Sequence, residues 1–579
     1  HPFAGVRPFF CQVLLDLMKL EPTGWLGWFS SDQYSKQKLS ADLEAIRSYY
    51  LDEGYLEFSL DSTQVSITPD KKDIYITLNL TEGNKYTVSG IKYAGAEKIL
   101  PHEEMSKLVV VAPGSTFSRK DLTASTTKIG DKLGDAGYAF ANVNAVPELD
   151  KEKHQVAFTF MVDPGNRVYV QHMNIAGNTK TADEVIRREF RQVEGGWFSA
   201  AKVKKSKQKV DKLDYFSEVN VETPPVPGSD DQLDVNVSVK EKSTGSFSVG
   251  AGVSSGEGLV LSAGISENNL FGTGNHIALQ VNTSRVNTIY SLAYTNPYYT
   301  DDGMSRGFNV YQRKSDTNST SVSQYLSNSI GGGVNFGVPV GDDESVSYGL
   351  AVDRTTLGLT AFSPQRFVDY VNTFGAASTT LVGTVGWNYD TRDSAIYTRE
   401  GLVQNAGVEA GLPVSKQRYY KLNYQQQWFH PVGRMLTLML NGEAGYAHGY
   451  GGKPLPFFKN YYAGGPGSVR GFDPMSLGPR DTNNNALGGD RRFVGNAELM
   501  FPMPGMSKEQ NVRLSVFTDA GAVYGPGDLP GTAGARYSAG AALLWVSPVG
   551  PLKLSFGKAL NAKPDDRLQK IQFTLGNMF

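Results

Sequence analysis

Long apolar runs, cysteine and excess charge are all scarce in this sequence of 579 residues. No apolar run approaches the about 20 residues that a transmembrane helix needs, and the mean hydropathy is −0.31. Strands of a transmembrane barrel alternate apolar and polar residues, so average hydropathy does not exclude that class of membrane protein. The single cysteine, Cys11, excludes an internal disulfide framework. The net charge of −2 gives no reason to expect nucleic acid as a partner.

Signatures of catalysis and of metal binding are also missing from the sequence. The seven histidines are scattered without metal-ligand spacing, and neither a nucleophile–base signature nor a phosphate-binding Gly-Lys-Ser/Thr loop occurs. His276, His430 and His448 have no evident catalytic companion. We therefore expect no enzyme, no cofactor and no metal site.

The first 243 residues contain a repeat with a period of about 80 residues. Its hallmark is a dipeptide that follows each predicted helix: Gly54-Tyr55, Gly137-Tyr138 and, in degenerate form, Asp214-Tyr215. Two strand patterns come after each dipeptide, so each unit reads β-α-α-β-β. Glycine suits the end of a helix because it readily adopts positive φ. We expect units at residues 1–83, 84–164 and 165–243, the first without its opening strand.

From Gly245 onward the apolar period changes to two, as in Phe247-Ser-Val249-Gly-Ala251. Such segments start near residues 245, 258, 275, 288, 304, 325, 343, 378, 401, 417, 434, 491, 511, 536, 550 and 570. Roughly 21 residues per strand and connection suit tilted membrane strands, and bacterial outer-membrane barrels have an even strand number. A soluble β-sandwich has shorter strands and would need more than one domain. The predicted fold is mixed: tandem α+β modules, then a 16-stranded antiparallel transmembrane β-barrel at residues 244–579.

Alternation also assigns several charged side chains to the barrel lumen. A cation at the midplane of the lipid face would cost about 2–4 kcal/mol, so charges belong inside. The inward positions are Asp390, Arg392, Glu498, Arg513 and Asp519.

The longest interruption of the strand pattern contains Gly464-Gly-Pro-Gly-Ser-Val469-Arg470-Gly471-Phe472. Long loops inside a compact domain are usually functional or disordered. Arg470 could donate to Glu498 and Asp519 together, because a guanidinium group offers five donors in a planar fork. Spacing alone leaves open the alternative that Arg470 is exposed and the two acids only solvate the pore.

With these features the chain resembles the BamA family, the outer-membrane β-barrel assembly proteins of Gram-negative bacteria. The resemblance is carried by the repeats, a final Phe579, and four motifs: Val469-Arg470-Gly471-Phe472, Leu270-Phe-Gly-Thr-Gly274, Asp390-Thr-Arg392-Asp393 and Ser547-Pro-Val-Gly-Pro551-Leu. It implies that the repeats are POTRA domains in the periplasm, the first unit here being the third of five. It also implies that the loop folds into the barrel and that Arg470 pairs with Glu498 and Asp519, stabilising the wall opposite a weak seam.

Closing the barrel requires its first strand to pair with its last. Strand glycines weaken such a seam, and an opened edge could accept a client strand by β-augmentation. The predicted seam residues are Gly245, Phe247, Gly250, Gly252, Gly576 and Phe579. Ordinary barrel curvature is the alternative explanation of these glycines. The resemblance implies that the protein lies in the cell outer membrane and folds and inserts outer-membrane proteins through this seam.

The implied partners are unfolded outer-membrane protein clients, lipoproteins of the BamB, BamC, BamD and BamE types, and outer-membrane lipid. The predicted lipoprotein-docking residues, in the last unit, are Arg187, Arg188, Glu189 and Arg191. The rival interpretation is a TamA-like or two-partner-secretion transporter of the same superfamily. Secretion pores typically carry two POTRA units and TamA-like proteins three, so the unit count does not exclude the latter. A passive porin is disfavoured because it needs no periplasmic repeats.

Overall fold

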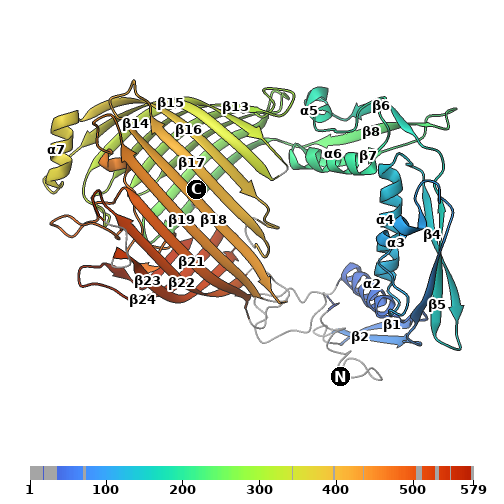
Figure 1. The fold of residues 1–579 in the computed structure, drawn as a ribbon. Coiled ribbons are helices and arrows are strands. Elements are labelled where there is room, and N and C mark those ends of the chain that lie inside the picture. Colours follow the sequence, from blue (N-terminus) through green and yellow to red (C-terminus); the bar gives the residue numbers. More distant parts are fainter. Residues whose placement is uncertain are drawn as a thin grey trace. The chain divides into compact units, whose positions relative to one another are not determined.

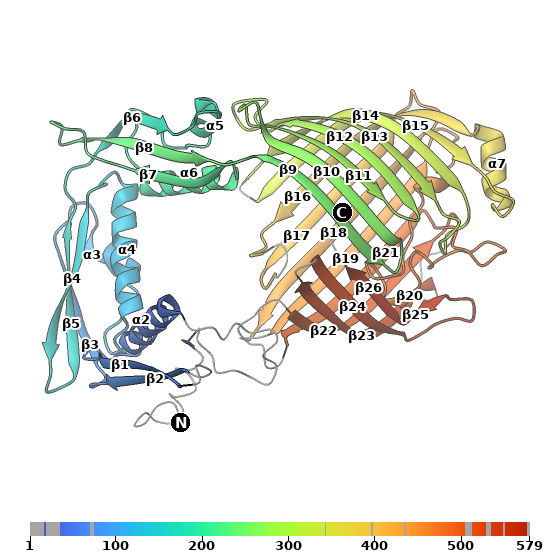
Figure 2. The same ribbon diagram turned by 180° about the vertical axis from the view of Figure 1, so that it is seen from behind.

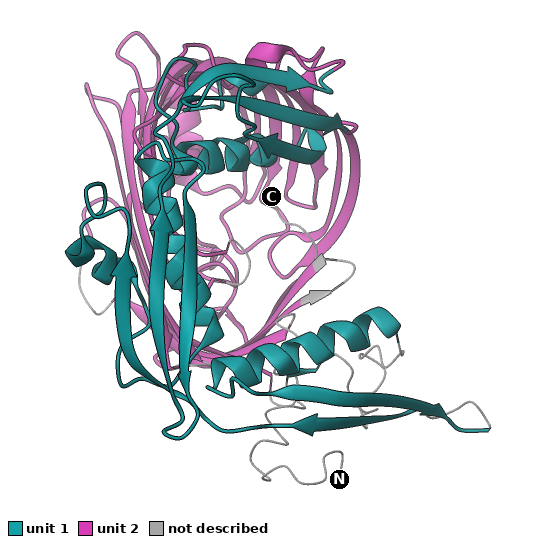
Figure 3. Ribbon diagram, turned by 90° about the vertical axis from the view of Figure 1, so that its right-hand side faces the viewer, with its two compact units in different colours: residues 1–178, 186–241 teal, residues 179–185, 242–579 magenta. Residues whose placement is uncertain are grey.

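The computed structural model describes residues 17–18, 35–69, 74–341, 343–394, 398–433, 436–503, 512–528, 534–547 and 550–575. The chain divides into two compact units (Figure 3). Unit 1 comprises residues 1–178 and 186–241, and unit 2 comprises residues 179–185 and 242–579. Within the described ranges, no helix is both long and apolar enough to cross a membrane.

Unit 1 is built from the three sequence repeats, apart from residues 179–185 of the third repeat, which belong to unit 2. The first contributes α2 (Lys36–Asp52), β1 (Ser59–Ile67) and β2 (Ile74–Thr81). The second contributes β3 (Thr87–Ala94), α3 (His102–Leu108), α4 (Arg119–Asp135), β4 (Asn142–Asp150) and β5 (Gln155–Asp163). The third contributes β6 (Tyr169–Ala176), α5 (Asp183–Arg187), α6 (Ala200–Lys212), β7 (Phe216–Glu222) and β8 (Gln232–Glu241). In the second and third repeats the opening strand pairs in parallel with the last strand, and the middle strand pairs antiparallel to it.

Glycines fix the backbone at equivalent points of the repeats. Gly54 and Gly137 both have φ +101°, which confirms the predicted left-handed helix ends, and Asp214 takes φ +61° at the degenerate site. Gly95 follows β3 with φ +83°, and a Cβ there would lie 2.1 Å from the Val162 carbonyl oxygen. Because no side chain fits that gap, the opening strand can lie directly against the last strand only with glycine at this position.

Unit 2 forms a closed barrel of sixteen antiparallel strands, which confirms the predicted fold class (Figures 1 and 2). The strands are β9 (Gly245–Ser254), β10 (Gly258–Leu270), β11 (Asn275–Thr283), β12 (Asn287–Asn296), β13 (Ser305–Asp316), β14 (Leu326–Pro339), β15 (Glu344–Gly358), β16 (Ala377–Asp390), β17 (Gly401–Gly411), β18 (Tyr419–Val432), β19 (Leu436–Gly449), β21 (Arg491–Pro502), β22 (Val512–Tyr524), β23 (Arg536–Ser547), β24 (Gly550–Ala559) and β26 (Ile571–Leu575). The period-2 pattern locates them because every strand has one outward and one inward face.

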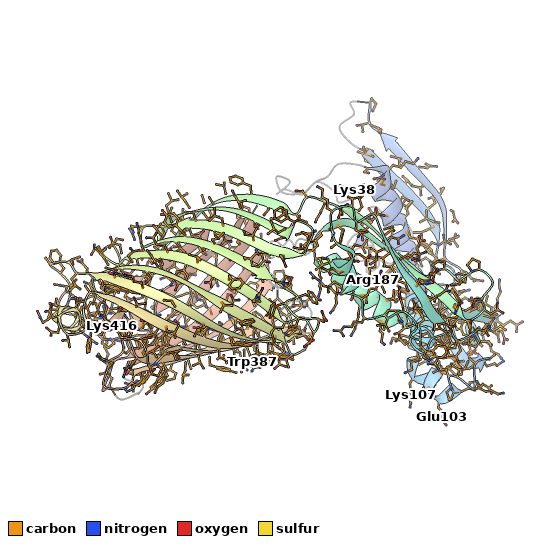
Figure 4. The ribbon with its side chains drawn as sticks, turned by 90° about the horizontal axis from the view of Figure 1, so that it is seen from above. Lys38, Glu103, Lys107, Arg187, Trp387 and Lys416 are labelled. Carbon is orange, nitrogen blue, oxygen red and sulfur yellow. The ribbon has the colours of Figure 1, made fainter. Side chains whose placement is uncertain are left out.

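Apolar side chains on the outer wall are strongly exposed. Phe247 is 73% exposed, Val249 72% and Ile265 59%. Such a surface is unfavourable in water and favourable in lipid, as expected of a membrane barrel. Trp387, near the end of β16, and Lys416, between β17 and β18, lie at opposite ends of the barrel (Figure 4).

Three connections pack together over the end of the barrel at which β19 terminates, and the first of them, between β13 and β14, carries Tyr325. The connection between β15 and β16 contains α7 (Gln365–Phe374), and the one between β19 and β21 contains η1 (Phe457–Lys459) and β20 (Gly471–Phe472). The rings of Phe367 and Phe457 stack with centroids 3.9 Å apart, and Tyr325 packs edge-on against both. The connection from β19 to β21, residues 450–490, is called the long loop below.

Candidate functional site: an inward-folded loop and a barrel seam

Arg470 of the long loop lies between two carboxylates of the barrel wall. Its Nε and Nη2 donate to Oδ2 and Oδ1 of Asp519, each at 2.8 Å, and its Nη1 donates to Oε2 of Glu498 at 2.9 Å. All three are buried, with Arg470 3% exposed, Asp519 1% and Glu498 6%. The arrangement with an exposed Arg470, which spacing alone left open, does not occur.

The surroundings of Arg470 fix its position and its charge. The guanidinium carbon lies 3.4 Å from the centroid of the Phe517 ring. Asn496 donates both to Oδ1 of Asp519 at 2.9 Å and to the Ser468 carbonyl at 2.7 Å. Burial by itself lowers the pKa of Arg470, but the hydrogen bonds to Asp519 and the charge of Glu498 outweigh it, so the pKa is raised above its ordinary value. One permanent cation is thus held by two acids on β21 and β22.

The other residues of the Val-Arg-Gly-Phe motif pack against the barrel wall. Val469 and Phe472 are fully buried. Gly471 has φ +90°, and a Cβ on it would lie 3.0 Å from backbone atoms of Gly557 in β24. A Cβ on Gly521 in β22 would meet Val469 at 2.4 Å. Gly471 therefore lets the loop backbone lie directly on β24, and Gly521 leaves room for the Val469 side chain.

The motif also pairs with the segment that leads into the last described strand. β20 forms a two-stranded antiparallel sheet with β25 (Leu568–Gln569). Gln572 of β26 donates to the Phe472 carbonyl at 2.6 Å and accepts from the Gly471 amide at 3.4 Å. Sequence reasoning missed Gln572, although its even position in an alternating segment marks it as facing the lumen.

A second charged contact holds the long loop to a different part of the wall. Nζ of Lys459 lies 2.6 Å from Oε1 of Glu409 in β17, and the Tyr419 hydroxyl donates to the same carboxylate at 2.5 Å. Tyr461 donates to Oδ1 of Asn423 at 2.8 Å. This anchor was also missed, because no sequence pattern shows which wall a loop residue will reach.

Asp390 and Arg392, predicted as lumen charges, pair with each other at the end of β16. Arg392 donates from Nε at 3.0 Å and from Nη2 at 2.7 Å to the two Asp390 oxygens. Arg513 donates to the Thr398 carbonyl at 3.0 Å. Within the described ranges, no group of three or more His, Cys, Asp or Glu side chains could hold a metal ion.

The barrel closes where β26 meets β9, and this seam is short in the described part of the chain. Two register pairs span it, Thr574 with Ser254 and Leu575 with Val253. By contrast, β9 pairs with β10 along its whole length. The predicted seam residues within β9 face β10 partners in this register: Gly245 with Glu267, Phe247 with Ile265, Gly250 with Ser262 and Gly252 with Val260. Gly576 and Phe579 lie outside the described residues.

The predicted docking residues of the third repeat differ in exposure. Arg187, labelled in Figure 4, is exposed and donates to Glu194 at 3.4 Å and to the Met173 carbonyl at 3.1 Å. Arg191 is exposed and Arg188 half-buried. Glu189 is only 5% exposed. The inclusion of Glu189 was therefore wrong, because its buried carboxylate is not presented to a partner.

The expectation that Arg470 braces the wall opposite the seam was wrong, although Lys459 of the same loop does reach that wall at Glu409 in β17. Asp519 belongs to β22, and only β23 and β24 separate that strand from β26. The loop reaches the wall beside the seam because the glycine contact and the β20–β25 pairing both involve the last hairpin.

Comparison with known proteins gives the family of the chain. Residues 269–579 match the Omp85 superfamily domain, and residues 3–83, 86–165 and 168–242 each match the POTRA, or surface antigen variable number, repeat. Outer membrane protein assembly factor BamA of Neisseria meningitidis is 36% identical over all of this chain and 77% of that protein. A crystal structure of Haemophilus ducreyi BamA lacking POTRA domains 1–3 is 31% identical, with a TM-score of 0.71, covering 85% of this chain and 100% of that one. CdiB of Acinetobacter baumannii, at 16% identity and a TM-score of 0.51, covers 86% of this chain and 91% of its own, and shares the fold. The chain belongs to the Omp85 superfamily and, within it, to the BamA family.

Proposed function

We propose that this protein is the central component of the outer-membrane β-barrel assembly machinery. It lies in the outer membrane of a Gram-negative bacterium, with its POTRA repeats in the periplasm. In this function it folds and inserts outer-membrane proteins by letting client strands add at the seam between β9 and β26. Its relative in Neisseria meningitidis is named as an outer membrane protein assembly factor, which supports the proposal.

The observation that carries the proposal is the contrast between the two edges of β9. One edge pairs with β10 from Gly245 to Ser254, and the other pairs with β26 at Ser254 and Val253 in the described residues. A backbone hydrogen bond contributes about 0.5–1.5 kcal/mol net, so the two register pairs of the described seam separate at a cost of a few kcal/mol. An incoming strand recovers that cost through main-chain hydrogen bonds, which tolerate many client sequences.

The binding free energy of strand addition drives this process, so the function needs no enzymatic step. The anchored long loop keeps the last strands of the barrel in place while the seam separates. Arg470, Glu498 and Asp519 supply that anchorage, because a buried charged pair with complete hydrogen bonding is costly to separate. Asp390 and Arg392 pair with each other at the end of β16, in another part of the barrel wall.

The proposed partners follow from the same surfaces. Unfolded outer-membrane proteins bind at the seam, and outer-membrane lipid covers the apolar outer wall. Lipoproteins of the BamB, BamC, BamD and BamE types bind the POTRA repeats, whose borders we place at residues 83, 164 and 243. Sheet edges offer β-augmentation there, and Arg187 and Arg191 offer exposed cations.

The alternative within the superfamily is transport of one dedicated secreted substrate, as in TamA-like or two-partner-secretion proteins. The match to CdiB at 16% identity supports only the common fold. Purification from native membranes separates the two: an assembly protein should bring several lipoproteins with it, whereas a secretion pore should bring its single substrate.

Reconstitution tests the function directly. The protein, with the lipoproteins that co-purify with it, is placed in liposomes and given a urea-unfolded outer-membrane barrel protein. Client folding is followed by heat-modifiable mobility and by protease protection. We expect faster folding than in empty liposomes or in liposomes that hold an unrelated porin. Equal rates in all three would contradict the proposal.

A further inference from the structure

We propose that Gln572 is a positioning residue that ties β26 to the long loop, so that β26 stays with the loop when the seam separates and β9 is the strand that moves. The separation of the seam rests on the proposed function, whereas the tie itself rests on geometry alone.

The side chain of Gln572 completes the backbone pairing of the loop motif. Gln572 is 1% exposed and reaches from β26 to the backbone of Gly471 and Phe472. It donates to the Phe472 carbonyl at 2.6 Å and accepts from the Gly471 amide at 3.4 Å. Among uncharged side chains, an amide is the group that offers a strong donor and a strong acceptor together. Gln572 therefore acts on the loop as a short neighbouring strand would.

Backbone contacts beside Gln572 reinforce the tie. Gly471 pairs with Gln569 and Phe472 with Leu568, and the Asp473 amide donates to the Arg567 carbonyl at 2.9 Å. Only Lys570 separates β25 from β26. The segment that leads into β26 and the strand itself are thus both bound to Gly471 and Phe472.

The loop cannot slide away from the last hairpin without breaking close contacts. A Cβ on Gly557 would lie 2.7 Å from the Gly471 amide nitrogen, so the loop and β24 meet backbone to backbone. Arg470, the preceding loop residue, is held by Asp519 and Glu498. The tie therefore connects β26 through the loop to β21 and β22, strands that are not its neighbours.

The two sides of β26 are held unequally. On one side β26 pairs with β24 from Ile571–Phe556 to Leu575–Leu552, and the buried Gln572 bonds add to that pairing. On the other side, two register pairs join it to β9 in the described chain, together with exposed bonds between Phe573 and Ser255. Buried hydrogen bonds are stronger than exposed ones because water does not compete for their partners. A force that separates β9 from β26 should therefore leave β26 attached to the loop.

A matched control exists at the register partner of Gln572. Ser555 of β24 is 3% exposed and donates to the Gln572 carbonyl at 3.4 Å. Among the described contacts its hydroxyl makes none with the long loop. Ser555→Ala thus removes a buried polar group from the same strand pair without touching the tie.

Hydrogen exchange of the full chain in a lipid bilayer tests the proposal, and its readout does not depend on assembly activity. In the unaltered protein we expect residues 571–575 to exchange more slowly than β9. Gln572→Leu, which keeps the volume but makes no hydrogen bond, should accelerate exchange about tenfold both at residues 471–473 and at residues 573–575. Ser555→Ala should leave residues 471–473 unchanged.

Gln572→Glu keeps the acceptor and, when ionised, lacks the donor. Its effect on exchange should therefore fall between those of Gln572→Leu and Ser555→Ala. This variant also tests the proposal if Gln572→Leu does not fold. Acceleration at residues 471–473 without any change at residues 573–575 would overturn the proposal. So would faster exchange of β26 than of β9 in the unaltered protein. Failure of client folding in liposomes with these exchange results intact would instead count against the proposed function.

Discussion

Arg470 donates to Asp519 from three nitrogen atoms: its backbone amide at 3.0 Å, and Nε and Nη2 of its guanidinium group at 2.8 Å each. The backbone bond fixes where the loop lies, and the two side-chain bonds fix the orientation of the guanidinium plane. Because both partners are buried, neither charge can be solvated if the other is removed.

Reversing the charge of one partner should therefore destabilise the folded protein, and reversing both charges should restore part of that stability. Removing one partner of a buried ion pair costs about 3–5 kcal/mol, so Arg470→Asp should lower the folded fraction and impair client assembly. Arg470→Asp with Asp519→Arg should restore both in part, because Glu498 remains near the new arginine. Heat-modifiable mobility and complementation of a depleted strain measure the two effects.

A surface pair provides the control for that reversal. Lys207 and Asp211 of α6 are 2.8 Å apart with both side chains exposed, so Lys207→Glu should cost at most about 0.5 kcal/mol. Normal folding and assembly by Arg470→Asp would show that the buried pair does not anchor the loop.

The second loop anchor should be separable from the first. Lys459→Met leaves Glu409 without its cation at 2.6 Å, so exchange and proteolysis at residues 456–462 should increase while residues 469–472 stay protected. Lys453→Met, in the same loop, removes, among the described contacts, a cation–π contact at 4.9 Å with the Phe374 ring and should change neither segment. If Lys459→Met releases both segments, the two anchors are one cooperative unit.

Two glycines of the second POTRA repeat allow the cost of a positive φ to be measured apart from the cost of a steric clash. Gly95 and Gly114 have φ +83° and +84°, but a Cβ would lie 2.1 Å from the Val162 carbonyl oxygen at Gly95 and meet nothing within 4 Å at Gly114. Both alanine variants should carry the penalty of positive φ, about 1–2 kcal/mol. Gly95→Ala should lose clearly more, measured as urea-dependent exchange protection of β3 and β5 in the full chain. Equal losses of exchange protection in the two variants would mean that the backbone near Val162 shifts at little cost to accommodate the added Cβ.

A carboxylate near β25 should make the last connection sensitive to acid. Asp566 accepts from Nε of Arg536 at 2.5 Å and lies 3.3 Å from Nη2 of Arg480 in the long loop. Burial alone raises the pKa of Asp566, but the bonds from Arg536 and the Lys563 amide outweigh it and hold the pKa below its ordinary value. A carboxylate whose pKa is lower in the folded state stabilises the fold at pH values above its unfolded-state pKa of about 3.9. That stabilisation is lost as the pH falls through the folded-state pKa.

Acidification below about pH 4 should therefore increase proteolysis at residues 560–567, and Asp566→Asn should remove that pH dependence. An unchanged acid response in Asp566→Asn would assign the effect to other groups.

Strand pattern and loop placement differ in how far the sequence predicts them. Each barrel strand begins within a few residues of its expected start because alternation is a local property. The inward faces of Glu498 and Asp519 follow from the same parity. The contacts of Lys459 with Glu409 and of Gln572 with Phe472 could not be predicted, since they depend on how a long loop enters the barrel. The wall that Arg470 binds was misassigned for the same reason.

The seam can be locked with two cysteines, which tests the central claim most directly. Ser254 and Thr574 are register partners across the seam, whereas Ser246 and Ser266 are partners within β9 and β10 with hydroxyl oxygens 2.7 Å apart. With Cys11 replaced by Ser, each pair is changed to cysteine, since facing residues of antiparallel strands lie within disulfide reach. Client folding is then measured in liposomes under oxidising and reducing conditions. The account predicts that oxidation of the Ser254→Cys/Thr574→Cys protein stops client folding and that reduction restores it, while the Ser246→Cys/Ser266→Cys protein folds clients in both states. Full client folding with the seam locked would contradict it.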